Sequence, residues 1–208
     1  MIQPFSLFDQ CVMLPYNNRV TERCLSFTCG DADLDDFFHN DAEHYATELM
    51  GKTYCWVTEE KPHRIVALFT LANDSIKTLH LDKTTRNRLN RPIDNPKRGR
   101  SYPATLIGRI GVNQEFQGMN VGSQLMQFIK DWFRHEDNKT GCRFLVVDAY
   151  NNPRTLRFYE RNNFRFLHTD EAEERAYYDI PTNYSVATRL MYFDNHKSDK
   201  FLCPDKFH

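Results

Sequence analysis

Residues 110–126, IGVNQEFQGMNVGSQLM, place two glycines and an asparagine between an apolar, strand-like run and a helical pattern. The first N–H groups of a helix have no partner inside the helix, and the helix dipole adds partial positive charge there. Gly118 and Gly122 allow a ligand to approach the backbone closely, and Asn120 tolerates a positive φ. The spacing is compatible with a phosphate-binding turn at residues 117–123. A plain helix cap with tightly packed glycines explains it equally well.

This turn differs from two common phosphate-binding motifs. It is not a P-loop, because no Gly-Lys-Ser or Gly-Lys-Thr follows the glycines. It is also not a dinucleotide-binding fingerprint, because the glycine spacing is different and no acidic residue closes a following strand at the expected place.

Apolar periodicity along the rest of the chain predicts both helices and strands. Residues 31–50 carry apolar and aromatic side chains at helical spacing, with Asp31 or Asp33 as the cap and Gly51 as the end. The other predicted helices are residues 121–136 and 152–163, and the predicted strands are residues 53–58, 64–72, 104–112, 143–149, 164–167 and 185–193. This order predicts a mixed α/β sheet with helices packed on it.

The composition predicts a single folded domain that spans residues 1–208. Hydrophobic residues make up 40% and aromatic residues 13% of the chain, which is enough for a core. The formal net charge of -1 gives no global argument for binding nucleic acid or a membrane surface. We find no signal peptide pattern and no apolar run long enough to span a membrane. The six cysteines have neither disulfide-like nor zinc-ligand spacing, which predicts reduced thiols, a cytoplasmic protein and no metal.

Residues 82–100, DKTTRNRLNRPIDNPKRGR, are strongly basic, and Pro92 and Pro96 are expected to break any helix. The segment is therefore predicted to be an exposed insertion loop. Either a solvated surface or a contact with an anion or a nucleic acid explains its charge. Residues 195–208 are predicted to be a loose C-terminal tail.

Two linked motifs resemble the acetyl-CoA site of the GNAT superfamily of N-acetyltransferases. The first comprises the strand RIGV at 109–112, the Gln-x-x-Asn-x-Gly loop at 117–122 and the apolar helix behind it. The second, NPRTLRFYERNNF at 152–164, is similar to the family's Asn-x-x-Ala-x-x-Phe-Tyr-x-x-x-Gly-Phe segment. The family usually has glycine where Asn120 and Asn163 stand, and asparagine is the next best residue for left-handed backbone.

The resemblance implies an α/β (α+β) fold with a GNAT-like mixed, mostly antiparallel central sheet flanked by helices. It also implies that acetyl-CoA is the cosubstrate. Main-chain groups of Ile110 and Val112 are expected to pair with the pantetheine arm, and Asn152 is expected to reach the cofactor near that arm. Backbone amides are expected to hold the pyrophosphate at Gln117, Gly118, Asn120, Val121, Gly122 and Ser123.

The resemblance also implies a catalytic role for Tyr159, which matches the family's tyrosine near the thioester sulfur. Acyl transfer to an amine needs a polarised carbonyl and a proton for the leaving thiolate. The alternative for Tyr159 is a core aromatic on an amphipathic helix. Glu115, Asp148 and His168 are candidates for a general base by position alone, and the sequence selects none of them.

The N-terminal half is similar to small GNAT proteins that include toxins acetylating aminoacyl-tRNA, at residues 27–37, 53–57, 67–72 and 106–112. A tRNA acceptor would be expected to contact basic residues in the segment 83–100, although the chain as a whole is less basic than most tRNA enzymes. A small-molecule or protein amine as the acceptor stays open, as does a non-catalytic CoA-binding or interaction module. Because sheet edges in such folds often pair, a homodimer is compatible with the sequence.

Overall fold

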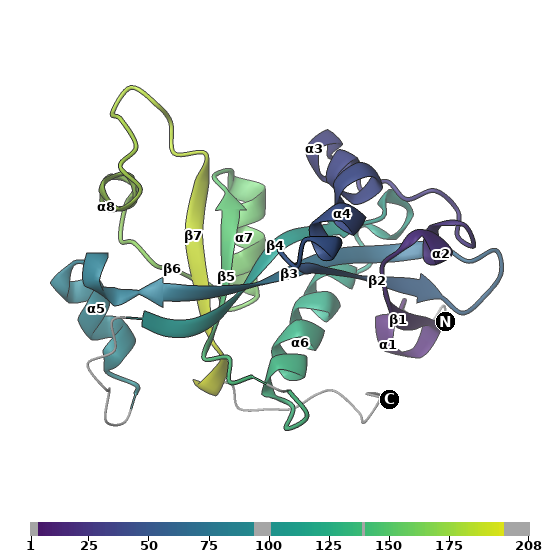
Figure 1. Cartoon of the computed structure of the whole chain (residues 1–208), viewed down its shortest axis with the longest axis horizontal. Coiled ribbons are helices and arrows are strands. Elements are labelled where there is room, and N and C mark those ends of the chain that lie inside the picture. Colours follow the sequence, from purple (N-terminus) through teal and green to yellow (C-terminus); the bar gives the residue numbers. More distant parts are fainter. Residues whose placement is uncertain (1–3, 94–100, 139, 198–208) are drawn as a thin grey trace. The chain divides into compact units, whose positions relative to one another are not determined.

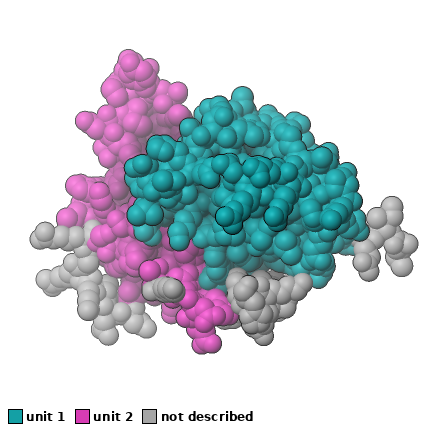
Figure 2. Space-filling model, turned by 45° about the vertical axis from the view of Figure 1, so that its right-hand side comes forward, with its two compact units in different colours: residues 1–73, 107–132, 201–208 teal, residues 74–106, 133–200 magenta. Residues whose placement is uncertain are grey.

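The computed structural model describes residues 4–93, 101–138 and 140–197. They divide into two compact units, which Figure 2 colours separately. The first unit contains residues up to 73 together with residues 107–132, and the second contains residues 74–106 and 133–200. The prediction of a single domain over residues 1–208 stays a prediction.

Seven strands form one sheet in the order β1-β2-β3-β4-β5-β7-β6 (Figure 1). Strands β4 and β5 pair in parallel, whereas β1 with β2, β2 with β3, β5 with β7 and β6 with β7 are antiparallel. This arrangement confirms the predicted mixed, mostly antiparallel α/β sheet. The strands are β1 (Cys11–Pro15), β2 (Lys52–Thr58), β3 (Ile65–Lys77), β4 (Ser101–Val112), β5 (Phe144–Tyr150), β6 (Arg165–Phe166) and β7 (Thr188–Asp194).

Among the described residues, the α-helices are α1 (Leu7–Gln10), α2 (Asn18–Thr21), α3 (Ala32–Asp36), α4 (Ala42–Thr47), α5 (Lys83–Asn90), α6 (Val121–Arg134), α7 (Pro153–Arg161) and α8 (Glu171–Tyr177). A π-helical turn, η1 (Phe37–Asp41), joins α3 to α4. Asp31 caps α3 by accepting a hydrogen bond from the Leu34 N–H, as predicted. The predicted end at Gly51 is wrong, because helical structure stops at Thr47 and Leu49 takes a positive φ of 57°.

In the first unit, helices cover both faces of β2 and β3 (Figure 1). Successive side chains of a strand point to opposite faces, so Cys55 and its neighbour Trp56 enter different layers. Cys55 belongs to a buried cluster with Phe38 of η1. Trp56 makes an edge-to-face contact with Phe128 of α6, at a centroid distance of 4.9 Å. The contact with Phe128 helps to fix α6, and with it the turn in front of that helix.

The second unit is also layered, and neighbouring residues of β7 mark its two faces. Tyr192 belongs to a buried cluster with Leu89 of α5. Phe193 packs against Phe164, which in turn contacts Tyr159 of α7 at a centroid distance of 5.5 Å. Helices α5 and α7 therefore pack on opposite faces of β7.

The basic segment 82–100 was predicted to be a loop, and this is wrong for residues 83–90, which form α5. The side chain of Asp82 caps the helix by accepting hydrogen bonds from the N–H groups of Thr84 and Thr85. Leu89 is buried and anchors the other end. Pro92 follows the helix and does not interrupt it. Residues 94–100 lie outside the described residues.

The first three residues of the predicted C-terminal tail have regular structure. Residues Asn195–Lys197 form a short 3-10 turn, η4, in which Asn195 is 4% exposed. The Asn195 carbonyl accepts a hydrogen bond from Arg134 Nε at 2.7 Å. The prediction for residues 195–197 is therefore wrong, and residues 198–208 lie outside the described part of the chain.

Candidate active site

The turn between β4 and α6 has the backbone conformation that its sequence predicts. Gly118 has a φ of 79° and Asn120 has a φ of 63°, both in the left-handed region. The first hydrogen bond of α6 runs from the Gln124 N–H to the Asn120 carbonyl at 3.2 Å. The N–H groups of Val121 and Gly122 therefore precede the first bond inside the helix, at its positive end.

This turn is open enough to receive a ligand. Residues 117–120 are exposed. A Cβ atom added to Gly118 would meet no other atom of the described residues within 4 Å, so the space beside this glycine is open. Exposed backbone, a glycine at the bend and a helix N-terminus are the features that bind a diphosphate. The residues of the turn therefore fit the diphosphate of coenzyme A.

The side chain of Gln117 holds the turn in place. Its Nε2 donates to the carbonyl of Cys29 at 2.8 Å and to the carbonyl of Val112 at 3.0 Å. The Gln117 N–H donates to the carbonyl of Gln114 at 3.3 Å. Of the six amides predicted for the pyrophosphate, that of Gln117 is therefore already hydrogen-bonded within the protein. The Gln117 side chain positions the turn, a role that the sequence prediction did not include.

Asn113 is a second positioning residue that the sequence prediction missed. It is 5% exposed, and its backbone N–H donates to the carbonyl of Val66 at 2.9 Å. Its side chain donates to the carbonyl of Ile65 and accepts from the N–H of Glu115. These bonds fix the end of β4 to the start of β3. The signal in the sequence was a polar amide directly after an apolar strand.

Ile110 and Val112 lie near the end of β4, in the first unit together with the turn. The parallel pairing of β4 with β5 covers Ala104–Leu106, earlier in the strand. Both side chains are half-buried. The carbonyl of Val112 accepts a hydrogen bond from the Gln117 side chain.

The second motif forms α7 of the second unit, with the predicted ends. The side chain of Asn152 caps the helix by accepting a hydrogen bond from the Thr155 N–H at 2.9 Å, and Pro153 occupies the first turn. Asn163 follows the helix with a φ of 61°, as its position in the motif predicts. Because the Asn152 side-chain oxygen is used in the cap, its NH₂ group is the part that can bind a ligand.

Tyr159 lies on the buried face of α7 and is 5% exposed. Its ring makes edge-to-face contacts with Phe158 and Phe164. Burial, followed by the negative charge of Asp148, raises the pKa of the Tyr159 phenol above its usual value of about 10. The phenol is therefore protonated at neutral pH, as a proton donor must be.

The three candidates for a general base differ in their surroundings. The Glu115 side chain is 60% exposed, and its carboxylate lies 3.5 Å from Nε of Arg64. Asp148 is exposed on β5. His168 is 3% exposed, and burial lowers the pKa of its imidazole, so the ring is neutral near pH 7. None of these observations selects one of the three.

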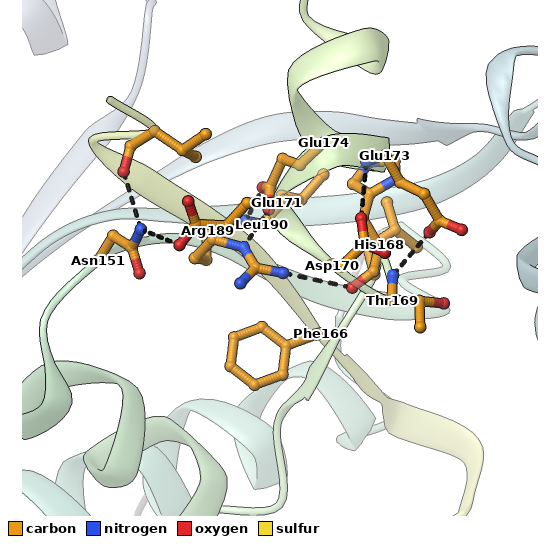
Figure 3. Close-up of polar contacts among 12 residues, drawn as sticks. Asn151, Phe166, His168, Thr169, Asp170, Glu171, Glu173, Glu174, Arg189 and Leu190 are labelled. Carbon is orange, nitrogen blue, oxygen red and sulfur yellow. Dashed lines mark hydrogen bonds and ion pairs between the residues drawn. The ribbon is translucent and has the colours of Figure 1, made fainter. Parts of the chain in front are cut away.

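Glu171, Glu173 and Glu174 lie close together in the sequence, and the structure turns one of them inward (Figure 3). Glu174 is 0% exposed and forms an ion pair with the buried Arg189. Its carboxylate also accepts a hydrogen bond from the Leu190 N–H. The Arg189 guanidinium lies 4.7 Å from the Phe166 ring centroid. The Glu174 carboxylate is thus bonded within the protein, so we assign it a role in stability.

Among the described residues, no group of three or more His, Cys, Asp or Glu side chains could hold a metal ion. No described helix is both long and apolar enough to cross a membrane. The five described cysteines, at positions 11, 24, 29, 55 and 142, are free thiols.

A family model, the acetyltransferase (GNAT) family, matches residues 22–164. The chain belongs to this family. The tRNA-acetylating toxin of Mycobacterium tuberculosis is 29% identical over 145 residues, which cover 70% of this chain and 80% of the toxin. This GNAT protein is thus an acetyl-CoA-dependent N-acetyltransferase, as its two motifs predicted.

Solved structures with a similar fold include a KacT mutant, with a TM-score of 0.66, 17% identity and coverage of 90% of this chain and 96% of KacT. AtaT complexed with acetyl-methionyl-tRNAfMet has a TM-score of 0.65 and 14% identity, covering 89% and 95%. AtaTR bound with acetyl-CoA has a TM-score of 0.64 and 15% identity, covering 90% and 95%. At these identities the likeness concerns the fold.

Proposed function

We propose that this GNAT protein transfers the acetyl group of acetyl-CoA to the α-amine of an aminoacyl-tRNA. The binding of acetyl-CoA is supported by the open turn before α6, with its two left-handed residues Gly118 and Asn120. The acceptor part rests on the relative that acetylates tRNA and on the AtaT complex with an acetylated aminoacyl-tRNA.

In the proposed complex, the backbone amides of the turn hold the diphosphate. The main chain of Ile110 and Val112 pairs with the pantetheine arm as an added strand would, and the NH₂ group of Asn152 binds near the same arm. Acetyl-CoA supplies an activated acetyl thioester. The amides that bind the diphosphate are those of Gly118, Asn120, Val121, Gly122 and Ser123.

The reaction is a direct attack in a ternary complex. The neutral amine nitrogen of the acceptor forms a bond with the carbonyl carbon, and the carbon–sulfur bond breaks. The Val112 N–H donates to the thioester oxygen and stabilises the charge that develops there. Tyr159 donates its phenolic proton to the leaving thiolate, while the amine proton passes to solvent. The raised pKa of the Tyr159 phenol means that it carries a proton at neutral pH.

The acceptor can be identified with labelled acetyl-CoA and a pool of charged tRNAs, with deacylated tRNA as the control that lacks the amine. We expect label on the aminoacyl group of charged tRNA only. Label in protein lysines, protein N-termini or small amines would replace the tRNA proposal by one of those acceptors. Acetyl-CoA binding without thiol release toward any acceptor would instead favour a non-catalytic module.

The M. tuberculosis relative is a toxin, and solved structures include KacTA bound to DNA and AtaT bound to part of the antitoxin AtaR. We propose by analogy that this chain is a toxin with an antitoxin partner. Induced expression in cells is expected to arrest growth, and Tyr159→Phe is expected to relieve the arrest. Normal growth while the active enzyme is present would contradict the toxin role. It would not contradict the proposed acetyl transfer.

A further inference from the structure

The second unit has a hollow of about 810 Å³ at the end of α7, between α5, β6 and β7. Exposed side chains line it, each with hydrogen-bond donors at its tip. They are Thr84, Asn87, Arg88, Arg91, Asn163 and Arg165. The volume falls within the range of about 300–1,000 Å³ that is typical of ligand sites.

The charge of this hollow favours an anion. Three arginines line it, and Asp194 is the one carboxylate among its described lining residues. Arg143 already pairs with Asp194 through two contacts, at 3.0 and 3.1 Å. The three lining arginines therefore keep a positive excess that no carboxylate of the hollow offsets.

Arg88 is held in a fixed position. Its guanidinium donates to the carbonyls of Phe166 and Leu167, at 3.2 and 2.5 Å. These two bonds anchor the side chain to the β6 segment. They reduce the conformational entropy that the side chain would lose on binding a ligand. Arg91 and Arg165 take no part in these two bonds, so they can be changed without removing them.

The floor of the hollow does not suit a nucleobase. Its aromatic residues are Phe144, Tyr192 and Phe193, which are 0%, 5% and 7% exposed. Their ring faces are therefore covered by protein and offer no platform on which a base could stack. Guanidinium, amide and hydroxyl donors without such a platform match phosphate and sugar groups.

We propose that this arginine hollow binds backbone phosphates of RNA and so docks the RNA part of the acceptor. The inference rests on the proposed function. Asn163, which lines the hollow, follows Tyr159 by four residues and lies just past the end of α7. An RNA chain held there is close to the helix that carries the proposed proton donor.

The test compares the unchanged enzyme with the double variant Arg91→Gln/Arg165→Gln. We measure binding of deacylated tRNA over a range of salt concentrations, and acetyl transfer to charged tRNA. Removing two phosphate contacts should weaken tRNA binding roughly tenfold and reduce the slope of log affinity against log salt by about 2. The KM for charged tRNA should rise, whereas kcat and the KM for acetyl-CoA should not change.

The matched control is Arg19→Gln/Arg23→Gln, which removes two exposed arginines of the first unit. It should bind tRNA with the same affinity and salt slope as the unchanged enzyme. Equal effects of the two double variants would overturn the proposal, because only the net charge would then matter. Displacement of tRNA by free coenzyme A, or preferential binding of an acidic peptide in the hollow, would also overturn it.

The two proposals fail in different ways. If the enzyme binds tRNA through the hollow but acetylates no charged tRNA, the proposed acceptor is wrong and the hollow stands. If the double variant still acetylates charged tRNA and its tRNA binding depends on salt as strongly as that of the unchanged enzyme, the proposed acceptor stands and the proposed role of the hollow is wrong. An enzyme that binds no tRNA at all refutes the hollow outright.

Discussion

The β4–α6 turn and the α8–β7 contact both concentrate polar groups, but they use them in opposite ways. In the turn, residues 117–120 are exposed and lie directly before the N-terminus of α6. In the α8–β7 contact, Glu174 and Arg189 are buried and bind one another. An exposed turn at a helix N-terminus suggests a binding site, whereas saturated buried charges suggest a structural role. The predictions below test this division.

Tyr159 is the strongest test, because it is buried like the ion pair and yet is proposed to react. Tyr159→Phe removes only the hydroxyl, so kcat should fall roughly thousandfold, within the usual range for a proton donor. Acetyl-CoA binding and thermal stability should change little. Stopped assays of thiol release measure kcat, and Tyr184→Phe, which changes an exposed tyrosine, is the control. An unchanged kcat would refute the assignment.

Glu174→Gln should lower the free energy of unfolding by about 3 kcal/mol, because Arg189 is left buried without its counter-charge. Glu171→Gln on the same helix is the matched control, and it should change stability by less than about 0.5 kcal/mol because Glu171 is exposed. Denaturant titration measures both variants. Similar values for the two variants would mean that the buried pair has no special role.

Gly118→Ala should affect ligand binding more than packing. The added methyl group meets no atom within 4 Å, but the φ of 79° disfavours any side chain. Strain of about 1–2 kcal/mol should therefore shift the turn and weaken acetyl-CoA binding by roughly five- to thirtyfold. Gly141→Ala, also in open space, is the control. Calorimetry with acetyl-CoA measures the affinity, and equal affinities in both variants would contradict a role for the turn.

His168 should make the second unit sensitive to acid. Burial lowers its pKa in the folded state, so below about pH 6.5 the unfolded chain binds the proton more readily and stability falls. His168→Phe keeps an aromatic ring against Tyr177 and should remove part of this loss between pH 6.5 and 5. His80→Phe, which changes an exposed histidine that also contacts Tyr177, is the control. Parallel pH profiles for all three proteins would contradict the prediction.

The sequence by itself determined the backbone of the two motifs. Gly118 and Asn120 bend the chain before α6, Asn152 caps α7 and Asn163 ends it, all as predicted. These features act within a few residues, because capping and left-handed backbone depend on local side chains. The resemblance of the two motifs to the GNAT site then predicted the family and its fold.

Only the tertiary structure decided how distant polar groups pair. Glu171, Glu173 and Glu174 are alike in the sequence, yet only Glu174 is buried, against Arg189 15 residues away. Gln117 binds the carbonyl of Cys29, 88 residues away. Residues 83–90 form a helix because Leu89 finds a buried cluster to join. Such contacts depend on which faces meet after folding, and local periodicity in the sequence does not predict them.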